Sequence, residues 1–144
     1  MTTQQQTDRN LTDIMWERHS NPLSAWSRIL SFPLLLAPFW YESGLLAIVA
    51  VFWFVANPFI FPPPSDDNAW STRGVLGERI WSQDIRLSAD TLILALSMAA
   101  AVAAIVFALR SAFWPMMTFT ATAFISQLWY FDRMHFLYDQ HMRS

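Results

Sequence analysis

The side chains that could do chemistry gather in three short polar segments that flank long apolar stretches. The segments are residues 17–22, 77–79 and 132–135. Their carboxylates, imidazoles and guanidinium groups can bind anions, exchange protons or ligate metals. With two further arginines nearby, the candidate binding residues are Glu17, Arg18, His19, Asn21, Arg28, Arg73, Glu78, Arg79, Asp132, Arg133 and His135.

Anion recognition is one interpretation of this set. Every basic residue other than histidine is an arginine, and arginine presents a forked, permanently charged donor to carboxylate or phosphate oxygens. His19 or His135 would then be available as an acid or base. The alternative is that the arginines pair inside the protein, with Arg28 bonded to Glu78 or Asp132.

A metal centre is another interpretation. Asp132 and His135 have the i, i+3 spacing of a carboxylate-x-x-His pair that ligates iron in four-helix bundles. Glu17 and His19 flank one residue, and Glu78 could bridge the two pairs. Oxygen and imidazole ligands suit iron or manganese. The apolar stretches add no ligands, so we predict no cofactor and keep this five-residue metal site as the alternative.

The elements that must position these residues are four apolar stretches. Charged residues make up 14% of the chain, against about 25% in soluble domains, and a helix of about 20 apolar residues crosses a bilayer. The sequence predicts one all-α domain over residues 1–144, an integral membrane four-helix bundle of two transmembrane hairpins. The spans are about 22–41, 44–61, 91–109 and 112–131, with a polar loop at 62–90.

The arginines indicate an orientation. Eight of the nine, Arg9 included, lie in the head, the central loop and the tail, and Arg110 alone lies in a turn on the other side. Basic residues favour the cytoplasmic side, which places both termini and the central loop in the cytoplasm. Short interfacial helices are expected there, one at 10–19 and one or two within 69–83. The polar first 21 residues do not fit a secretory signal peptide.

Two further patterns concern the spans themselves. Pro33 and Pro38 should kink the first one. Thr118, Thr122 and Ser126 repeat every four residues along the last, which predicts hydrogen bonds between helices. A transporter would instead have a polar groove along this stripe.

Composition also limits the partners. The net charge of −2 and the lack of a large basic patch exclude bulk nucleic-acid binding, and the lack of cysteine excludes thiolate chemistry. The expected partners are the lipid bilayer and either anionic lipid headgroups or another membrane protein.

Four strings carry a resemblance to a known family: WERHSNPLSAW at 16–26, NPFIFPPP at 57–64, GVLGERIW at 74–81 and WYFDRM at 129–134. Together they resemble an uncharacterised family of small bacterial and archaeal multi-span membrane proteins, a domain of unknown function. The resemblance runs from about residue 15 to 139. It implies a multi-span helical fold in a prokaryotic cytoplasmic membrane and supplies no activity.

The sequence therefore favours a binding or accessory protein with a polar Arg/Glu/Asp/His site at the cytoplasmic face. The alternative is a small membrane enzyme that acts on a lipid or headgroup substrate, with or without a metal. No motif in the chain decides between them.

Overall fold

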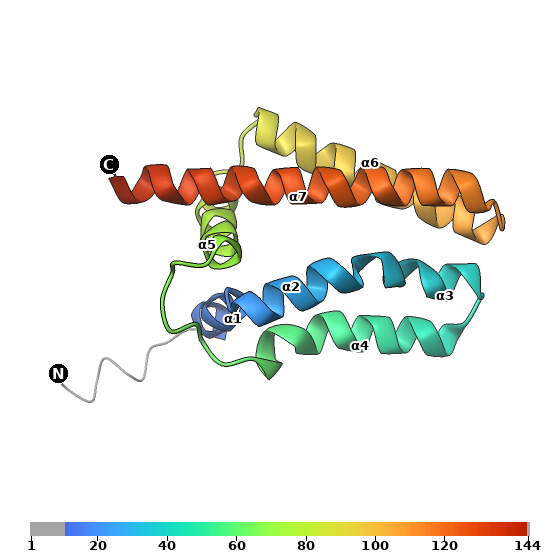
Figure 1. Cartoon of the computed structure of the whole chain (residues 1–144), viewed down its shortest axis with the longest axis horizontal. Coiled ribbons are helices and arrows are strands. Elements are labelled where there is room, and N and C mark those ends of the chain that lie inside the picture. The colour runs from blue at the N-terminus through green and yellow to red at the C-terminus, as the bar shows by residue number, and fades with distance from the viewer. Residues whose placement is uncertain (1–10, 144) are drawn as a thin grey trace.

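The computed structural model describes residues 11–143, and over this range the chain forms helices and no strands. The all-α prediction is therefore confirmed. Arg9 and residue 10, which the sequence assigned to the head and to the first interfacial helix, lie outside the described range. The helices form two long hairpins, with two shorter helices across one end (Figure 1).

The first hairpin begins with a chain segment that prolines divide. Asn21 caps α2 (Pro22–Ser31) by accepting a hydrogen bond from the Leu23 amide. The 3₁₀ helix η2 (Phe32–Leu36) and the short α3 (Ala37–Trp40) follow, each with a proline in its first turn. The predicted kinks are confirmed, and the expected single helix over 22–41 is instead three short helices, because proline cannot donate the helical hydrogen bond.

The second arm of this hairpin is α4 (Gly44–Ile60), which Ser43 caps. A buried polar contact joins it to α2: Ser24 donates to Asn57 Oδ1 (2.7 Å), and Asn57 Nδ2 donates to Ser27 (2.8 Å). Asn57 is 0% exposed. A buried amide is tolerated when its polar atoms are paired, so this contact fixes α4 against α2.

The central polar stretch contains a single helix, α5 (Trp70–Gln83), where one or two were expected. It lies against α7 (Phe113–Arg143) at Gly77, whose Cα approaches the Met134 backbone so closely that a Cβ would lie 1.9 Å from the Met134 carbonyl oxygen. Glycine permits this approach because it has no side chain. The glycine therefore sets the distance between α5 and α7.

The second hairpin consists of α6 (Ala89–Leu109) and α7. Small residues of α6, including Ala100, Ala104 and Ala108, are buried, and such residues let helix backbones approach closely. α7 continues to Arg143, well past residue 131, where the predicted span ends. The hairpin is therefore longer on the side of the chain's tail (Figure 1).

Two of the three residues in the predicted polar stripe on α7 do not join helices. Thr118 donates to the Trp114 carbonyl and Thr122 donates to the Thr118 carbonyl, so both hydroxyls bond within α7. A hydrogen bond between α6 and α7 comes instead from Ser97, whose hydroxyl donates to the Ala123 carbonyl (3.1 Å). For Thr118 and Thr122 the prediction was wrong, because a threonine in a helix can bond to the carbonyl four residues before it.

The two ends of the bundle are built from different elements. Both hairpin turns lie at one end, and α1 (Leu11–His19), α5 and the end of α7 lie at the other (Figure 1). α1 and α5 run across the hairpin axes rather than along them. This is the arrangement predicted for the head, the central loop and the tail.

By length and apolar composition, α6 is the one described helix that could cross a membrane, and α4 is a shorter apolar helix. Only 28% of the most apolar stretch of α6 is buried within the protein. Large apolar side chains are also exposed along α4, among them Leu45, Ile48, Phe52 and Val55. These helices therefore present apolar surface outward instead of enclosing it.

Candidate functional site

Arg28 occupies the centre of the candidate site. It lies on the second turn of α2, where its Nε donates to the Ser24 carbonyl (3.1 Å) and its Nη2 donates to the His19 carbonyl (3.2 Å). Its Nη1 lies 2.8 Å from Nδ1 of the His19 ring. The half-buried guanidinium is thus held on the end of α1 by neutral groups.

Glu78 of α5 lines the same cavity as His19 and Arg28. Burial raises the pKa of the Glu78 carboxyl, and the charge of Arg28 opposes that rise. Burial lowers the pKa of His19 to about 3, and Arg28 lowers it in the same direction. His19 is therefore neutral near pH 7, which suits its contact with a cation.

The expected ion pairs of Arg28 are not formed. Neither Glu78 nor Asp132 makes an ion pair with it, although Glu78 is close enough to feel its charge. Asp132 instead accepts a hydrogen bond from Trp70 Nε1 (3.0 Å). The prediction of an Arg28 ion pair was wrong: Asp132 is bonded to Trp70, and Arg28 is bonded to two backbone carbonyls and the His19 ring.

Three other candidate arginines bond to groups on other helices of the protein. Arg18 donates to the Phe59 carbonyl (3.1 Å) at the end of α4, a common way to satisfy the last carbonyls of a helix. Arg79 forms an ion pair with Asp13 of α1. Arg133 donates to Asp90 (2.7 Å) at the start of α6.

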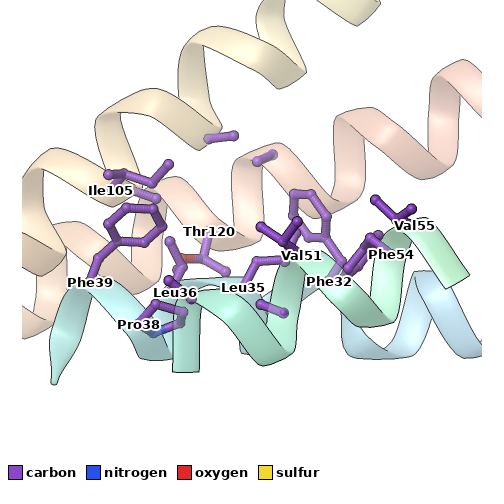
Figure 2. Close-up of a pocket in the computed structure, with 15 residues that line it drawn as sticks. Phe32, Leu35, Leu36, Pro38, Phe39, Val51, Phe54, Val55, Ile105 and Thr120 are labelled. Atoms are coloured by element: carbon purple, nitrogen blue, oxygen red, sulfur yellow. The ribbon is translucent and has the colours of Figure 1, made fainter. Parts of the chain in front are cut away.

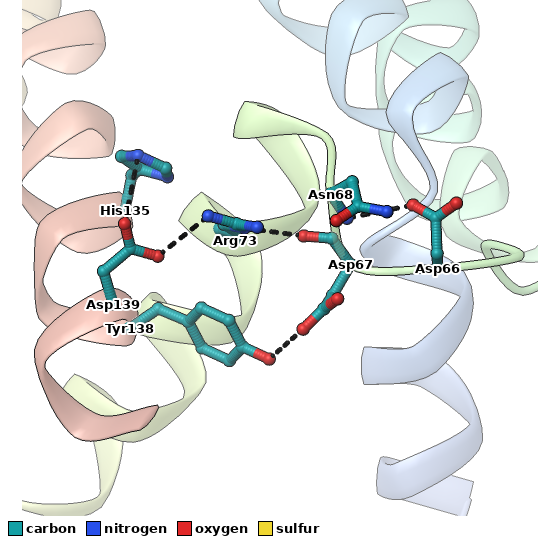
Figure 3. Close-up of polar contacts among 7 residues, drawn as sticks. All are labelled: Asp66, Asp67, Asn68, Arg73, His135, Tyr138 and Asp139. Carbon is teal, nitrogen blue, oxygen red and sulfur yellow. Dashed lines mark hydrogen bonds and ion pairs between the residues drawn. The ribbon is translucent and has the colours of Figure 1, made fainter. Parts of the chain in front are cut away.

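Arg73 belongs to a separate polar cluster that fastens the loop before α5 to α7 (Figure 3). Its Nε donates to the Asp67 carbonyl (2.8 Å), and its Nη1 lies 3.1 Å from Asp139. Tyr138 donates to the Asp67 carboxylate (2.6 Å), and His135 Nε2 lies 3.8 Å from Asp139. The candidates Arg73 and His135 thus lie in a clasp that the sequence did not reveal.

The five residues proposed as metal ligands are divided among these places. His19 and Glu78 line the cavity at Arg28, Asp132 bonds to Trp70, His135 lies in the clasp, and Glu17 lies on α1 outside the cavity lining. Within the described residues, no group of three or more such side chains is placed to hold a metal ion. The geometry therefore gives the iron or manganese alternative no support.

Asn21 contributes by shaping the site. Besides capping α2, its amide donates to the Pro62 carbonyl (2.9 Å), and Thr72 of α5 donates to the Ser20 carbonyl (2.8 Å). These bonds join the end of α1, the start of α2, the loop after α4 and α5. They fix the backbone from which His19, Arg28 and Glu78 extend.

The cavity at Arg28 has a volume of about 330 Å³ and lies between the two hairpins. Gln127 of α7 adds an amide to its polar end, and the remaining lining is mostly aromatic and aliphatic. Sequence reasoning missed Gln127, because a single amide within an apolar helix gives no spacing pattern to detect. A second cavity of about 410 Å³ adjoins it and is lined almost wholly by apolar side chains (Figure 2).

The chemistry available here is that of a fixed cation at the end of an apolar cleft. Arginine has five N–H donors, and the neutral partners of Arg28 leave its charge without a carboxylate in contact. A carboxylate or phosphate oxygen is the natural partner of such a group. The neutral imidazole of His19 and the carboxyl of Glu78 line the same cavity and are the groups that could exchange a proton there.

Fold and site together define an all-helical protein of two hairpins with a polar site at one end of an apolar cleft. The chain belongs to the Family of unknown function (DUF6653), whose model matches residues 8–144. The inferred membership of a domain of unknown function is thereby confirmed. No curated protein and no solved structure matches the chain.

Proposed function

We propose that this chain is a four-span protein of a prokaryotic cytoplasmic membrane, with both termini and the loop before α5 in the cytoplasm. The outward apolar surfaces of α4 and α6 support this, because contiguous exposed apolar surface of that extent is rare on soluble monomers. The collection of arginines at the α1–α5 end supports the orientation.

We further propose that it is a binding or accessory protein whose site takes the anionic group of a membrane lipid. The observation that carries this proposal is the half-buried Arg28 guanidinium, which makes no ion pair within the described residues and faces a cavity. A buried cation without a contacting counter-ion is costly. An anionic headgroup would supply the missing charge from the cytoplasmic side.

A small membrane enzyme acting on a lipid headgroup is the second candidate. It is favoured by a neutral imidazole and a carboxyl of raised pKa in the same cavity as the cation. In that case Arg28 would hold the headgroup while His19 or Glu78 moved a proton. Turnover of an added lipid that both His19→Gln and Glu78→Gln abolish would favour this candidate over simple binding.

The orientation can be tested directly because the chain has no cysteine. Single cysteines at Asp66 and Met142, and at the turn positions Glu42 and Arg110, are all at exposed sites. In intact cells, an impermeant maleimide should label the turn cysteines and leave the other two unlabelled. Labelling of Asp66→Cys together with the turn cysteines would refute the proposed topology.

Lipid binding can be tested by thermal unfolding in a neutral detergent, because a ligand that binds the folded state raises its melting temperature. Phosphatidylglycerol should raise it more than phosphatidylcholine. The increase should be lost in Arg28→Gln and kept in Arg86→Gln, since Arg86 is exposed and pairs with Asp84. Equal shifts from both lipids, or equal responses of the two variants, would contradict the proposal.

A further inference from the structure

We propose that the two cavities form one continuous cleft that holds the hydrocarbon tail of a single-tailed acidic amphiphile, with its head against Arg28. This rests on the proposed function and names its ligand class, a long-chain carboxylate being the simplest member.

The two cavities share part of their walls. Phe32, Leu35 and Phe54 line both of them. The first cavity contains His19, Arg28 and Glu78, and the second extends along η2 and α3 to Pro38 and Phe39. Arg28 and Pro38 lie ten positions apart along α2, η2 and α3, which corresponds to roughly 15–18 Å along the axis. The shared walls make a slot that runs from the polar end toward the hairpin turns.

The shape of the slot follows from the residues on its two sides. The lining includes bulky side chains of the first hairpin, such as Leu36 and Phe39 (Figure 2). It also includes small ones of the second hairpin, Ala101 and Ala104. Alanine leaves space where a larger residue would fill the contact between the hairpins. The space has the size of common ligand sites, about 300–1,000 Å³.

The lining of the second cavity, which extends toward the hairpin turns, favours a hydrocarbon chain. Its one side-chain hydroxyl belongs to Thr120, and that hydroxyl already donates to the Met116 carbonyl (2.7 Å). A polar ligand would lose its hydration there without gaining hydrogen bonds. An alkyl chain has no hydrogen bonds to lose, and in a bilayer it exchanges lipid contacts for similar protein contacts.

The position of the positive charge decides how the amphiphile is oriented in the cleft and which kind of head group it carries. Among the described residues, Arg28 is the only cation that lines either cavity, and its partners are neutral. An acidic head at this end and a tail directed toward the turns match both ends of the cleft. A second copy of this chain or a neutral lipid tail would leave the guanidinium without a counter-ion.

Photo-crosslinking can locate the tail. The probes are two long-chain carboxylates, one with a diazirine at the tail end and one with a diazirine beside the head, added to the protein in a neutral bilayer. The tail-end probe should label residues around Leu36, Ala47 and Ile105. The head-side probe should label residues around Gln127 and Ile29. Crosslinked peptides are then identified by mass spectrometry.

A matched pair of variants tests the slot itself. Ala101→Phe adds a ring to the lining, whereas Ala99→Phe adds the same ring to an exposed position of the same helix. Tail-end labelling should fall about tenfold in Ala101→Phe, equivalent to about 1.4 kcal/mol, and stay unchanged in Ala99→Phe. The wild-type crosslink map gives the result independently if Ala101→Phe fails to fold.

The outcomes separate this inference from the proposed function. Labelling spread over the exposed faces of α4 and α6, insensitive to Ala101→Phe, would overturn the cleft inference, while an Arg28-dependent response to phosphatidylglycerol would keep the proposed function. Loss of both the response and the cleft labelling would refute both. Cleft labelling that Arg28→Gln weakens supports the inference.

Discussion

The close approach of α5 to α7 at Gly77 gives the sharpest stability prediction. A Cβ at Gly77 would lie 1.9 Å from the Met134 carbonyl oxygen and 2.6 Å from its carbonyl carbon. Ordinary contacts of this kind begin at 3.4 Å, so Gly77→Ala must separate α5 from α7 by about 1.5 Å. Neither atom of Met134 can rotate away, because both belong to a helix backbone.

The expected cost is large for a single methyl group. Overpacking typically costs about 1–3 kcal/mol and sometimes more, and a backbone clash belongs at the upper end. Replacing glycine by alanine inside a helix returns about 1 kcal/mol. We expect a net loss of about 2 kcal/mol or more, which for a chain of this size lowers the melting temperature by roughly 4–8 °C.

The other two glycines are the controls, and thermal unfolding in detergent is the assay. At Gly74 a Cβ would meet the Phe131 ring at 2.6 Å, but a side chain can move, so Gly74→Ala should cost less than Gly77→Ala. At Gly44 nothing lies within 4 Å, so Gly44→Ala should be neutral or stabilising. A Gly77→Ala protein that melts at or above the wild-type temperature would refute this packing of α5 on α7.

Three further predictions concern buried polar groups. Asn57→Leu removes the acceptor of the buried Ser24 hydroxyl and should cost about 1–3 kcal/mol in thermal unfolding, part of which the double variant with Ser24→Ala should recover. His19 has its pKa lowered from 6.5 to about 3, so the unfolded state binds more protons between these values and stability should fall as pH falls below 6.5. His19→Gln should flatten that melting profile, and an unchanged profile would show that His19 titrates normally. The charged form of Glu78 would compete with an anionic lipid for Arg28, and burial raises the pKa of Glu78, so Glu78→Gln should enlarge the melting shift caused by phosphatidylglycerol and reduce the pH dependence of that shift; a smaller shift would assign Glu78 to lipid binding.

Local signals in the sequence predicted the helices well. The predicted second span, 44–61, matches α4 because Ser43 caps its start and prolines follow its end. The prediction for 22–41 placed the kinks at Pro33 and Pro38 but not the division into three helices. The prolines locate the interruptions, but whether the chain bends or changes to a 3₁₀ helix between them is not specified by the proline pattern alone.

The site was predicted less completely than the helices. Of the eleven candidate residues, His19, Arg28 and Glu78 line the cavity. Asp132 illustrates the difficulty, because its partner Trp70 lies 62 residues away on a helix that crosses α7. The apolar cleft was not predicted at all, since it depends on the fit between two hairpins rather than on any residue pattern.

The arginines show how a compositional signal and a site differ. For orientation every arginine counts equally, because the asymmetry is a sum of charges on two sides. In the structure, Arg73, Arg79, Arg86 and Arg133 each contact an aspartate, and such pairs need no ligand to account for them. Arg28 is held instead by two backbone carbonyls and a neutral imidazole, beside a cavity with an apolar extension. An arginine whose side chain only extended to water would not need this support. We therefore propose that the charge is positioned for an anion that enters the cleft.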